Sequence, residues 1–178
     1  MKRNSLKDIG IDLHDLFEYE DGALIWKEPP DSFFDDPRSK KRFVSRYAGK
    51  QAGRKTGDYR EVGIKGKRYA EHRIIYFMFT GEEPDYVDHR DGDTNNNRFN
   101  NLRAATNSTN QANAKMRHDN ASGVKGVSWH KAKGKWRATI THNGKSKHLG
   151  LFDSLDEAKR VRQQAAYEVF GDYIDHDR

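Results

Sequence analysis

The chain has 178 residues, of which 34% are hydrophobic and 34% charged, and its 33 basic against 27 acidic residues give a net charge of +6. This length suits one or two small domains and not a large enzyme core. No stretch approaches the roughly 18 apolar residues of a membrane span, and the start lacks a signal-peptide run, so we expect a cytoplasmic protein without a membrane partner. The absence of cysteine excludes disulfides and thiolate zinc sites, which makes an oxygen-ligated ion such as Mg²⁺ the expected metal.

Short elements are expected over the first 58 residues. The sequence predicts a helix within 11–17, a turn at 20–22 that leads into a strand at 23–27, and a polar loop at 29–41. That loop contains the run Ser-Lys-Lys-Arg. We expect residues 1–58 to form an N-terminal extension of the module that follows.

A hairpin and a buried helix are predicted next. Residues 59–64 and 68–70 are typical of two strands joined by a tight Lys-Gly-Lys turn. The apolar run 72–79 indicates a buried helix that stops at Thr80-Gly81. His72 heads this run, and we expect it to pack in the interior in preference to contacting phosphate.

The stretch 87–114 contains almost nothing that builds a core. Val87, Phe99 and Leu102 are its only large apolar residues. We therefore predict a long ordered loop whose side chains hydrogen-bond one another, followed by a helix that is capped by Thr106 or Asn107. A loop this polar within a folded domain suggests a site.

Three residues of this stretch could perform hydrolysis. Asp88 supplies a ligand for a hard metal, the adjacent His89 can take a proton near neutral pH, and Asn110 can offer a carbonyl oxygen to the same ion. Asp-His pairs and Asn-rich turns are also common without catalysis, so the residues alone leave both interpretations open. A calcium-binding EF-hand is excluded because Asn96 stands where that loop requires Gly.

The same stretch resembles the HNH homing endonuclease family of phages and introns over about residues 59–117. The residues that carry the resemblance are His72-Arg73, Val87-Asp88-His89-Arg90-Asp91-Gly92-Asp93, Asn96-Asn97-Arg98, Asn100-Asn101-Leu102-Arg103 and Asn110. The resemblance implies a ββα-metal (His-Me finger) nuclease in which His89 is the general base and Asn101 braces the loop. Asn110 would be the third motif residue and would share Mg²⁺ or Mn²⁺ with Asp88, with no structural zinc.

The chemistry of phosphodiester hydrolysis fits these residues. The reaction needs an activated water and a cation that offsets charge on the phosphate, and one His with one metal ion supplies both. Adjacent residues on a strand point to opposite faces, so a turn or bulge is expected to re-aim Asp88 and His89. Arg90, Arg103 and His72 are possible phosphate contacts.

The last third predicts a three-stranded antiparallel sheet and one helix. Strands are expected at 124–130, 135–142 and 145–152, and Asn143-Gly144 is a strong hairpin signal. Ser154 begins a helix whose apolar residues recur with a period of 3.6 and which Gly171 ends. A linker at 118–122 precedes this unit.

Positive charge is concentrated in this last third. Residues 115–148 carry 9 basic and 1 acidic residue, whereas residues 1–60 carry 13 and 11. Trp129, Trp136 and two threonines are interleaved with these cations, so we predict a sheet with a cationic face that binds nucleic acid. Trp129 is expected to be exposed or partly stacked, and Trp136 could lie in the core or on the surface.

Residues 123–174 resemble the apetala-two/ethylene-response-factor (AP2/ERF) DNA-binding domain, whose sheet enters the major groove. By position the resemblance implies base contacts from Ser128, His130, Lys133, Thr139, Thr141 and His148, and phosphate contacts from Lys125, Lys135, Arg137 and Lys147. Several positions that usually hold Arg or Trp differ here, so no target sequence is carried over.

The sequence thus predicts an α+β protein in which an HNH nuclease module at 59–117 is targeted by a DNA-binding module at 123–174. The expected reaction is metal-dependent cleavage of double-stranded DNA, leaving 5′-phosphate and 3′-hydroxyl ends as the family does. A monomer or weak dimer should nick, in a host cytoplasm if a phage encodes it. The alternatives are a non-catalytic DNA-binding regulator and an RNA-directed or structure-specific nuclease.

Overall fold

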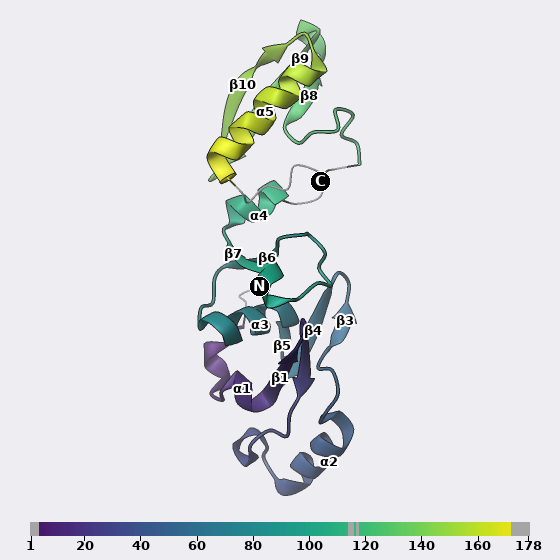
Figure 1. Cartoon of the computed structure of the whole chain (residues 1–178), viewed down its shortest axis with the longest axis vertical. Coiled ribbons are helices and arrows are strands. Elements are labelled where there is room, and N and C mark those ends of the chain that lie inside the picture. The colour runs from purple at the N-terminus through teal and green to yellow at the C-terminus, as the bar shows by residue number, and fades with distance from the viewer. Residues whose placement is uncertain (1–3, 114–115, 117, 172–178) are drawn as a thin grey trace. The chain divides into compact units, whose positions relative to one another are not determined.

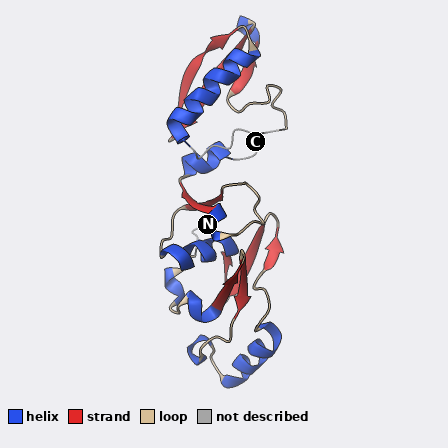
Figure 2. Ribbon diagram, viewed as in Figure 1, coloured by secondary structure: helices blue, strands red, loops and turns tan. Residues whose placement is uncertain are grey.

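The computed structural model describes residues 4–113, 116 and 118–171. The chain divides into two compact units, unit 1 (Met1–Ala104) and unit 2 (Ala105–Arg178). Each unit combines short helices with small sheets (Figures 1 and 2). The prediction of a mixed α and β protein is therefore confirmed, with the strands distributed over several small sheets.

Unit 1 is built from short elements in close succession. In chain order they are η1 (Lys7–Ile9), α1 (Leu13–Leu16), β1 (Phe17–Glu20), β2 (Ala23–Trp26), η2 (Asp31–Phe33), α2 (Pro37–Tyr47), β3 (Arg54–Thr56), β4 (Tyr59–Ile64), β5 (Lys67–Ala70), α3 (Glu71–Thr80), β6 (Tyr86–His89), η3 (Phe99–Asn101) and β7 (Leu102–Ala105). Strands β1 and β2 form an antiparallel hairpin, β3, β4 and β5 an antiparallel sheet, and β6 pairs with β7.

Helix α3 lies at the centre of unit 1. Its residues Ile74 and Ile75 are fully buried and share a core with Leu24 of β2 and Val62 of β4. Gly81 ends the helix in the left-handed region, at φ 69°, and its N–H donates to the carbonyl of Phe77. The buried helix predicted at 72–79 and the hairpin before it are confirmed.

The polar loop predicted at 29–41 is wrong, because α2 begins within it. The Asp36 carboxylate accepts a hydrogen bond from the Ser39 N–H at 2.9 Å, and Pro37 occupies the first helical position. Both are signals of a helix start that the local polarity hid. Farther along α2, Phe43 packs edge-to-face on Trp26 at 4.9 Å between ring centroids, which attaches the helix to β2.

Unit 2 has the predicted sheet and helix. It contains α4 (Asn107–Asn113), β8 (Val127–His130), η4 (Lys131–Lys133), β9 (Lys135–His142), β10 (Lys145–Phe152) and α5 (Leu155–Phe170), with β9 between β8 and β10. Asn143 and Gly144 both have positive φ, as a tight two-residue hairpin requires. Ser154 caps α5 and Thr106 caps α4, as predicted.

One face of this sheet is covered by α5 (Figure 1). Ala138 and Ile140 of β9 are buried, as are Ala158 and Ala166 of the helix. The small alanines allow helix and sheet to approach closely, and the other face of the sheet is left open for contacts. In the described part of the chain, no helix is long and apolar enough to cross a membrane.

We expect Gly126→Ala to destabilise unit 2 strongly. Gly126 has φ +76°, and a Cβ atom there would overlap the carbonyl oxygen of Thr139, which belongs to the neighbouring strand. Gly123 is a matched control because it has φ +72° but nothing within 4 Å of the corresponding Cβ position. The free energy of unfolding in urea should fall by about 1–3 kcal/mol more for Gly126→Ala than for Gly123→Ala. Equal losses would contradict the packing described.

Candidate active site

Strand β6 carries the Asp88-His89 pair at its end. The strand continues through His89, and the turn comes after it, where the Gly92 N–H donates to the His89 carbonyl at 3.0 Å. The expected turn or bulge between the two residues is therefore not observed. Their side chains accordingly have different partners, Arg103 for Asp88 and Asn97 for His89.

His89 is held in the interior of unit 1, where only 4% of it is exposed. Its Nε2 lies 2.8 Å from Oδ1 of Asn97. The ring of His72 meets it edge-to-face at 5.1 Å, and the Tyr59 ring packs on His72 at 5.2 Å. His72 is thus a packed residue, as the sequence predicts, and its role is to support the His89 ring.

A hydrogen-bonded chain sets the tautomer of the neutral His89 ring. Nδ2 of Asn97 donates to Oε2 of Glu71 at 2.8 Å. Because an ionised carboxylate only accepts, the Asn97 amide presents Nδ2 to Glu71 and Oδ1 to His89. The neutral imidazole then carries its hydrogen on Nε2, which leaves Nδ1 as the basic nitrogen. This is the tautomer that a general base acting through Nδ1 needs.

Glu71 anchors this chain at the first residue of α3. Only 2% of it is exposed, its Oε1 accepts a hydrogen bond from the Leu24 N–H at 3.2 Å, and Nε of Arg60 lies 3.7 Å from Oε2. Burial raises the pKa of Glu71 above its ordinary value, although the hydrogen bonds from Leu24 and Asn97 and the charge of Arg60 lower it. These partners place the carboxylate in one position.

Asn101 connects the two sides of the polar loop. Its Oδ1 accepts from the Asp91 N–H at 3.1 Å, and its Nδ2 donates to Oδ1 of Asp91 at 2.9 Å and to the Asn96 carbonyl at 2.8 Å. Burial raises the pKa of Asp91, but hydrogen bonds from Asn101, Asn96 and the Asp93 N–H outweigh it, so the pKa is lowered overall. These are the bonds expected of a residue that braces the loop.

The loop is also attached to the N-terminal hairpin. Nε and NH2 of Arg98 both lie 2.7 Å from the Asp21 carboxylate, and the Phe99 N–H donates to the Tyr19 hydroxyl at 3.0 Å. The Phe99 ring stacks on Phe79 of α3 at 4.4 Å. Residues from the predicted N-terminal extension therefore position the site loop.

Asp88 and Arg103 form a buried ion pair. Nε and NH2 of Arg103 lie 3.1 and 2.9 Å from Oδ2 of Asp88, and the two side chains are 8% and 12% exposed. The Arg103 guanidinium is directed to Asp88 on the paired strand, and its contact with phosphate stays a prediction. Arg90 is exposed.

The donors predicted for a metal are oxygens of suitable chemistry. No group of three or more His, Asp or Glu side chains within the described residues is placed to hold a metal ion. The predicted pair, Asp88 and Asn110, would not form such a group, and Mg²⁺ typically takes one or two protein oxygens and completes its shell with water and phosphate. A carboxylate offers about four lone pairs, so Asp88 can accept from Arg103 and ligate a cation. Asn110 lies in α4 of unit 2.

The open face of the unit 2 sheet carries most of the predicted DNA contacts. Strand pairing sets Ser128 opposite Arg137, His130 opposite Lys135 and His148 opposite Thr139. Since side chains alternate along β9, Lys135, Arg137, Thr139 and Thr141 share one face with these partners. Lys133 is exposed in η4, at the turn between β8 and β9.

Two predicted phosphate contacts are placed elsewhere. Lys147 pairs with Ile140, whose side chain is buried under α5, so it lies on the opposite face of the sheet from Arg137. Lys125 donates from Nζ to the Ala112 carbonyl at 2.9 Å and so binds the end of α4. Trp129 is 49% exposed and meets Trp136 edge-to-face at 5.2 Å, as expected of a partly stacked residue.

Sequence comparison assigns a class to the site region. Residues 69–112 match the family model of HNH endonucleases, which covers α3, β6, β7 and nearly all of α4. The prediction of an HNH endonuclease domain is confirmed at these residues. In chain order β6, β7 and α4 follow the ββα sequence of elements, and the ββα-metal arrangement itself stays a prediction.

A phage protein is also similar to this chain. The two are 41% identical over 71 residues, and the relative is Protein 3.8 of Escherichia phage T7. The alignment covers 40% of this chain and 59% of the length of that protein. No solved structure matches the chain. The resemblance of residues 123–174 to the AP2/ERF domain remains a prediction.

Two residues that are connected to His89 by hydrogen bonds escape sequence reasoning. Asn97 is one of several asparagines in a run, and nothing local distinguishes it from its neighbours. Glu71 precedes an apolar run, and a carboxylate at the start of a buried helix is the signal that could have found it. Both are revealed by the hydrogen bonds that connect them to His89.

We expect the neutral His89 ring to be protonated at Nε2. The Asn97 amide enforces this tautomer, so Asn97→Ala should yield a mixture of the two tautomers, whereas Asn95→Ala, in the exposed part of the same loop, should leave it unchanged. Nitrogen-15 NMR of the histidine rings distinguishes the tautomers. A wild-type His89 protonated at Nδ1 would contradict the orientation of the chain.

Proposed function

We propose that this protein is a metal-dependent HNH endonuclease that hydrolyses phosphodiester bonds of double-stranded DNA. The observation that carries the proposal is the buried His89, fixed by Asn97 and Glu71 inside the segment that matches HNH endonucleases. A packed core histidine would be satisfied by one partner. Here a buried carboxylate is added behind the amide, which sets the tautomer of the ring.

In the proposed reaction His89 removes a proton from the attacking water through Nδ1. The Asn97 amide and Glu71 keep the ring in position and stabilise the imidazolium that forms, as an acidic partner does for other catalytic histidines. Asn101 keeps the loop closed around this residue by its bonds to Asp91 and Asn96. Arg90, which is exposed beside His89, is a candidate for a phosphate contact.

The proposed metal ligands are Asp88 and Asn110, which would hold Mg²⁺ or Mn²⁺. When bound, such an ion offsets the charge that develops on the phosphate and at the leaving oxygen. Arg103 orients Asp88 through two hydrogen bonds to one oxygen. A metal ion at Asp88 would be held by a carboxylate whose direction Arg103 already fixes.

Unit 2 is proposed to target the nuclease to DNA. The open face of its sheet groups Lys135 and Arg137 with hydroxyl and imidazole side chains, and a β-sheet of this kind fits the major groove. With one proposed active site in each chain, a monomer or weak dimer is expected to nick and to leave 5′-phosphate and 3′-hydroxyl ends. Since the relative is a phage protein, we place the reaction in a host cytoplasm.

The first test is the relaxation of a supercoiled plasmid in the presence of Mg²⁺. His89→Ala should lower the nicking rate by roughly 10²- to 10⁴-fold, the range that a general base contributes. His118→Ala is the matched control, because His118 is exposed and lies outside the site. If His89→Ala nicks as fast as His118→Ala, His89 is not the base.

A chelator distinguishes the nuclease from a DNA-binding regulator. A regulator would bind DNA equally with and without chelator and would never cut it, whereas the proposed enzyme loses cleavage when the metal is removed. Competition among duplex DNA, RNA and branched DNA tests the structure-specific alternative. Preferred cleavage of RNA or of branched DNA would replace duplex DNA as the proposed substrate.

The second test concerns the sheet of unit 2. Lys135→Gln with Arg137→Gln should weaken DNA binding and reduce the slope of log affinity against log salt by about two, since each phosphate contact contributes close to one. Lys159→Gln with Arg160→Gln on α5 removes the same charge from the helix and is the control. If the slope falls equally in the sheet variant and in the helix control, the sheet does not form the DNA interface.

A further inference from the structure

A second cationic segment lies in unit 1; its last residue, Arg60, pairs with Glu71, but the proposed reaction gives no role to the cations that precede it. Residues 37–60 carry 9 Lys and Arg against one acidic residue, Asp58, whereas residues 1–36 carry 4 basic and 10 acidic residues. The segment therefore has a net charge of +8. When charge is summed over residues 1–60, the acidic first part and the basic second part nearly cancel, so the total hides the cationic segment.

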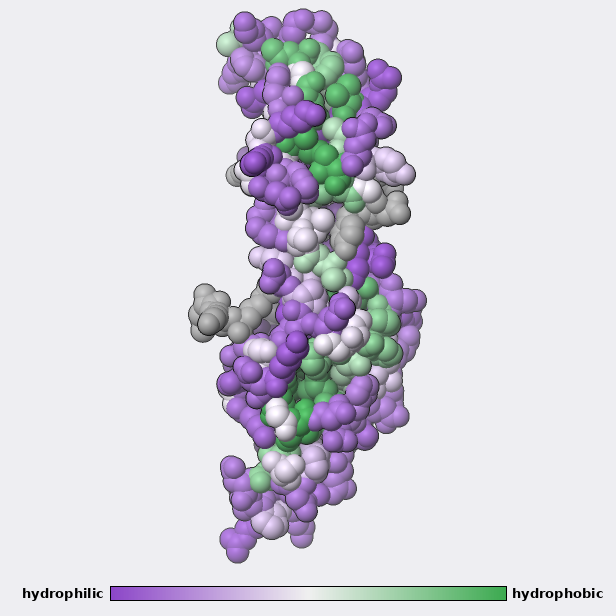
Figure 3. Space-filling view, turned by 90° about the vertical axis from the view of Figure 1, so that its left-hand side faces the viewer, coloured by the Kyte–Doolittle hydropathy of each residue, from purple (hydrophilic) through white to green (hydrophobic). Residues whose placement is uncertain are grey.

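The cations of α2 lie on the side of the helix that faces away from the core. Phe43, Val44 and Tyr47 recur at three- and four-residue spacing, and Phe43 packs on Trp26. Arg38, Lys41, Arg42 and Arg46 are all exposed and recur with the same spacing on the opposite side. On the face of unit 1 that Figure 3 draws, hydrophilic residues surround a smaller hydrophobic area.

The acidic residues of unit 1 leave most of these cations unneutralised. Lys40 pairs with Asp31 at 2.7 Å and with Glu28 at 3.4 Å. Within the described residues, no carboxylate lies within ion-pair distance of Arg38, Lys41 or Arg46. Cations gathered in this way repel one another, so the fold gains from a polyanion that covers them.

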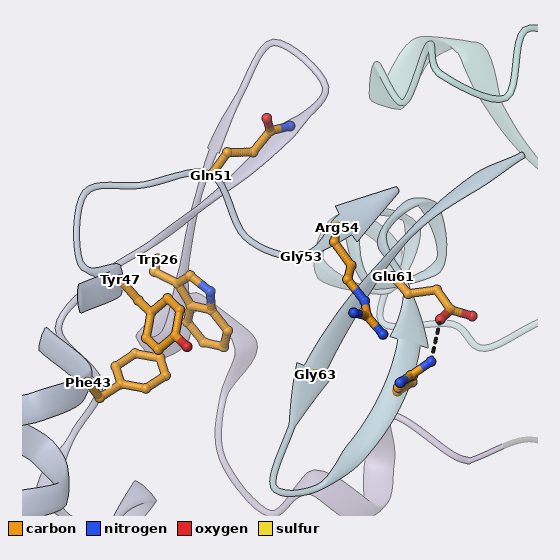
Figure 4. A pocket seen from close by; sticks show the side chains of 9 residues that line it. Trp26, Phe43, Tyr47, Gln51, Gly53, Arg54, Glu61 and Gly63 are labelled. Atoms are coloured by element: carbon orange, nitrogen blue, oxygen red, sulfur yellow. Dashed lines mark ion pairs between the residues drawn. The ribbon is translucent and has the colours of Figure 1, made fainter. Parts of the chain in front are cut away.

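Strand β3 extends the cationic surface across a cavity. The cavity has a volume of about 460 Å³ and lies between α2 and the β3-β4-β5 sheet. Figure 4 shows Tyr47 and Phe43 on one side of it and Arg54 on the other. Arg54 is exposed on an edge strand, so it adds a cation on the β3 side of the cavity, whereas the α2 side is lined by the rings of Phe43 and Tyr47.

We propose that the exposed cations of residues 37–60 form a second DNA-binding surface, which contacts the phosphate backbone of duplex DNA. The inference deepens the proposed function, on which it rests. The stripe from Arg38 to Arg46 spans eight residues, about 12 Å of helix, a distance over which duplex DNA carries about seven charges. The contacts involve phosphates, so binding here adds affinity that does not depend on DNA sequence.

The test removes three exposed charges from the full-length chain. In Arg38→Gln/Lys41→Gln/Arg46→Gln, binding to a fluorescent 30-base-pair duplex of arbitrary sequence is measured by anisotropy, in chelator, over a salt series. The slope of log affinity against log salt should fall by about two to three relative to wild type, equally for unrelated duplexes. The control, Lys7→Gln/Lys67→Gln/Arg160→Gln, removes the same charge from exposed positions elsewhere and should leave the slope near wild type.

The outcomes separate this surface from the nuclease. A slope equal to that of the control overturns the proposal, and so does a loss of RNA binding with unchanged DNA binding. If the slope falls as expected but wild type never nicks a plasmid, the surface stands and the nuclease assignment fails. Unfolding curves in urea that match wild type show that the triple variant is folded, as expected for solvent-exposed side chains.

Discussion

The hydrogen-bonded chain from Glu71 through Asn97 to His89 is the interaction on which unit 1 depends. It starts at the first residue of α3, where the carboxylate also accepts the Leu24 N–H of β2, and it ends on β6. One buried carboxylate thus connects the helix, the N-terminal hairpin, the polar loop and the candidate catalytic strand. Leaving any member unpartnered would expose a buried polar group to an apolar interior, at a cost of about 1–3 kcal/mol.

The polar loop shows how a site without cysteine keeps its shape. Its inner part is held by Asn101 and Asp91, and its outer part by the pair between Arg98 and Asp21 of the β1-β2 turn. These hydrogen bonds and the ion pair fix the loop at both of its parts. The β1-β2 hairpin is therefore part of the support of the site, which gives this acidic hairpin a structural role besides its charge.

Local signals in the sequence account for the elements that were predicted correctly. The hairpin at Asn143-Gly144, the Ser154 cap and the apolar run of α3 each depend on neighbouring residues. The sheet face on which Lys147 lies could also have been predicted from the sequence, because a two-residue turn at 143–144 fixes the pairing of residue 147 with residue 140. Glu71, Asn97 and Arg103 could not be assigned in this way, since their partners lie 8 to 47 residues away in sequence and outside the same helix or hairpin.

Net charge is informative about a surface only when it is summed over the segment that forms that surface. The segments 37–60 and 115–148 each carry 9 basic residues and one acidic residue. The first segment belongs to unit 1 and the second to unit 2. Charges farther apart than a Debye length of about 8–10 Å act independently, so a net charge of +6 for the whole chain says little about either surface. Two cationic surfaces joined by one chain bind the same polyanion more tightly than either alone, because binding of the first raises the local concentration of the second. Weak phosphate contacts in each unit would then suffice to keep the His89 site on its DNA.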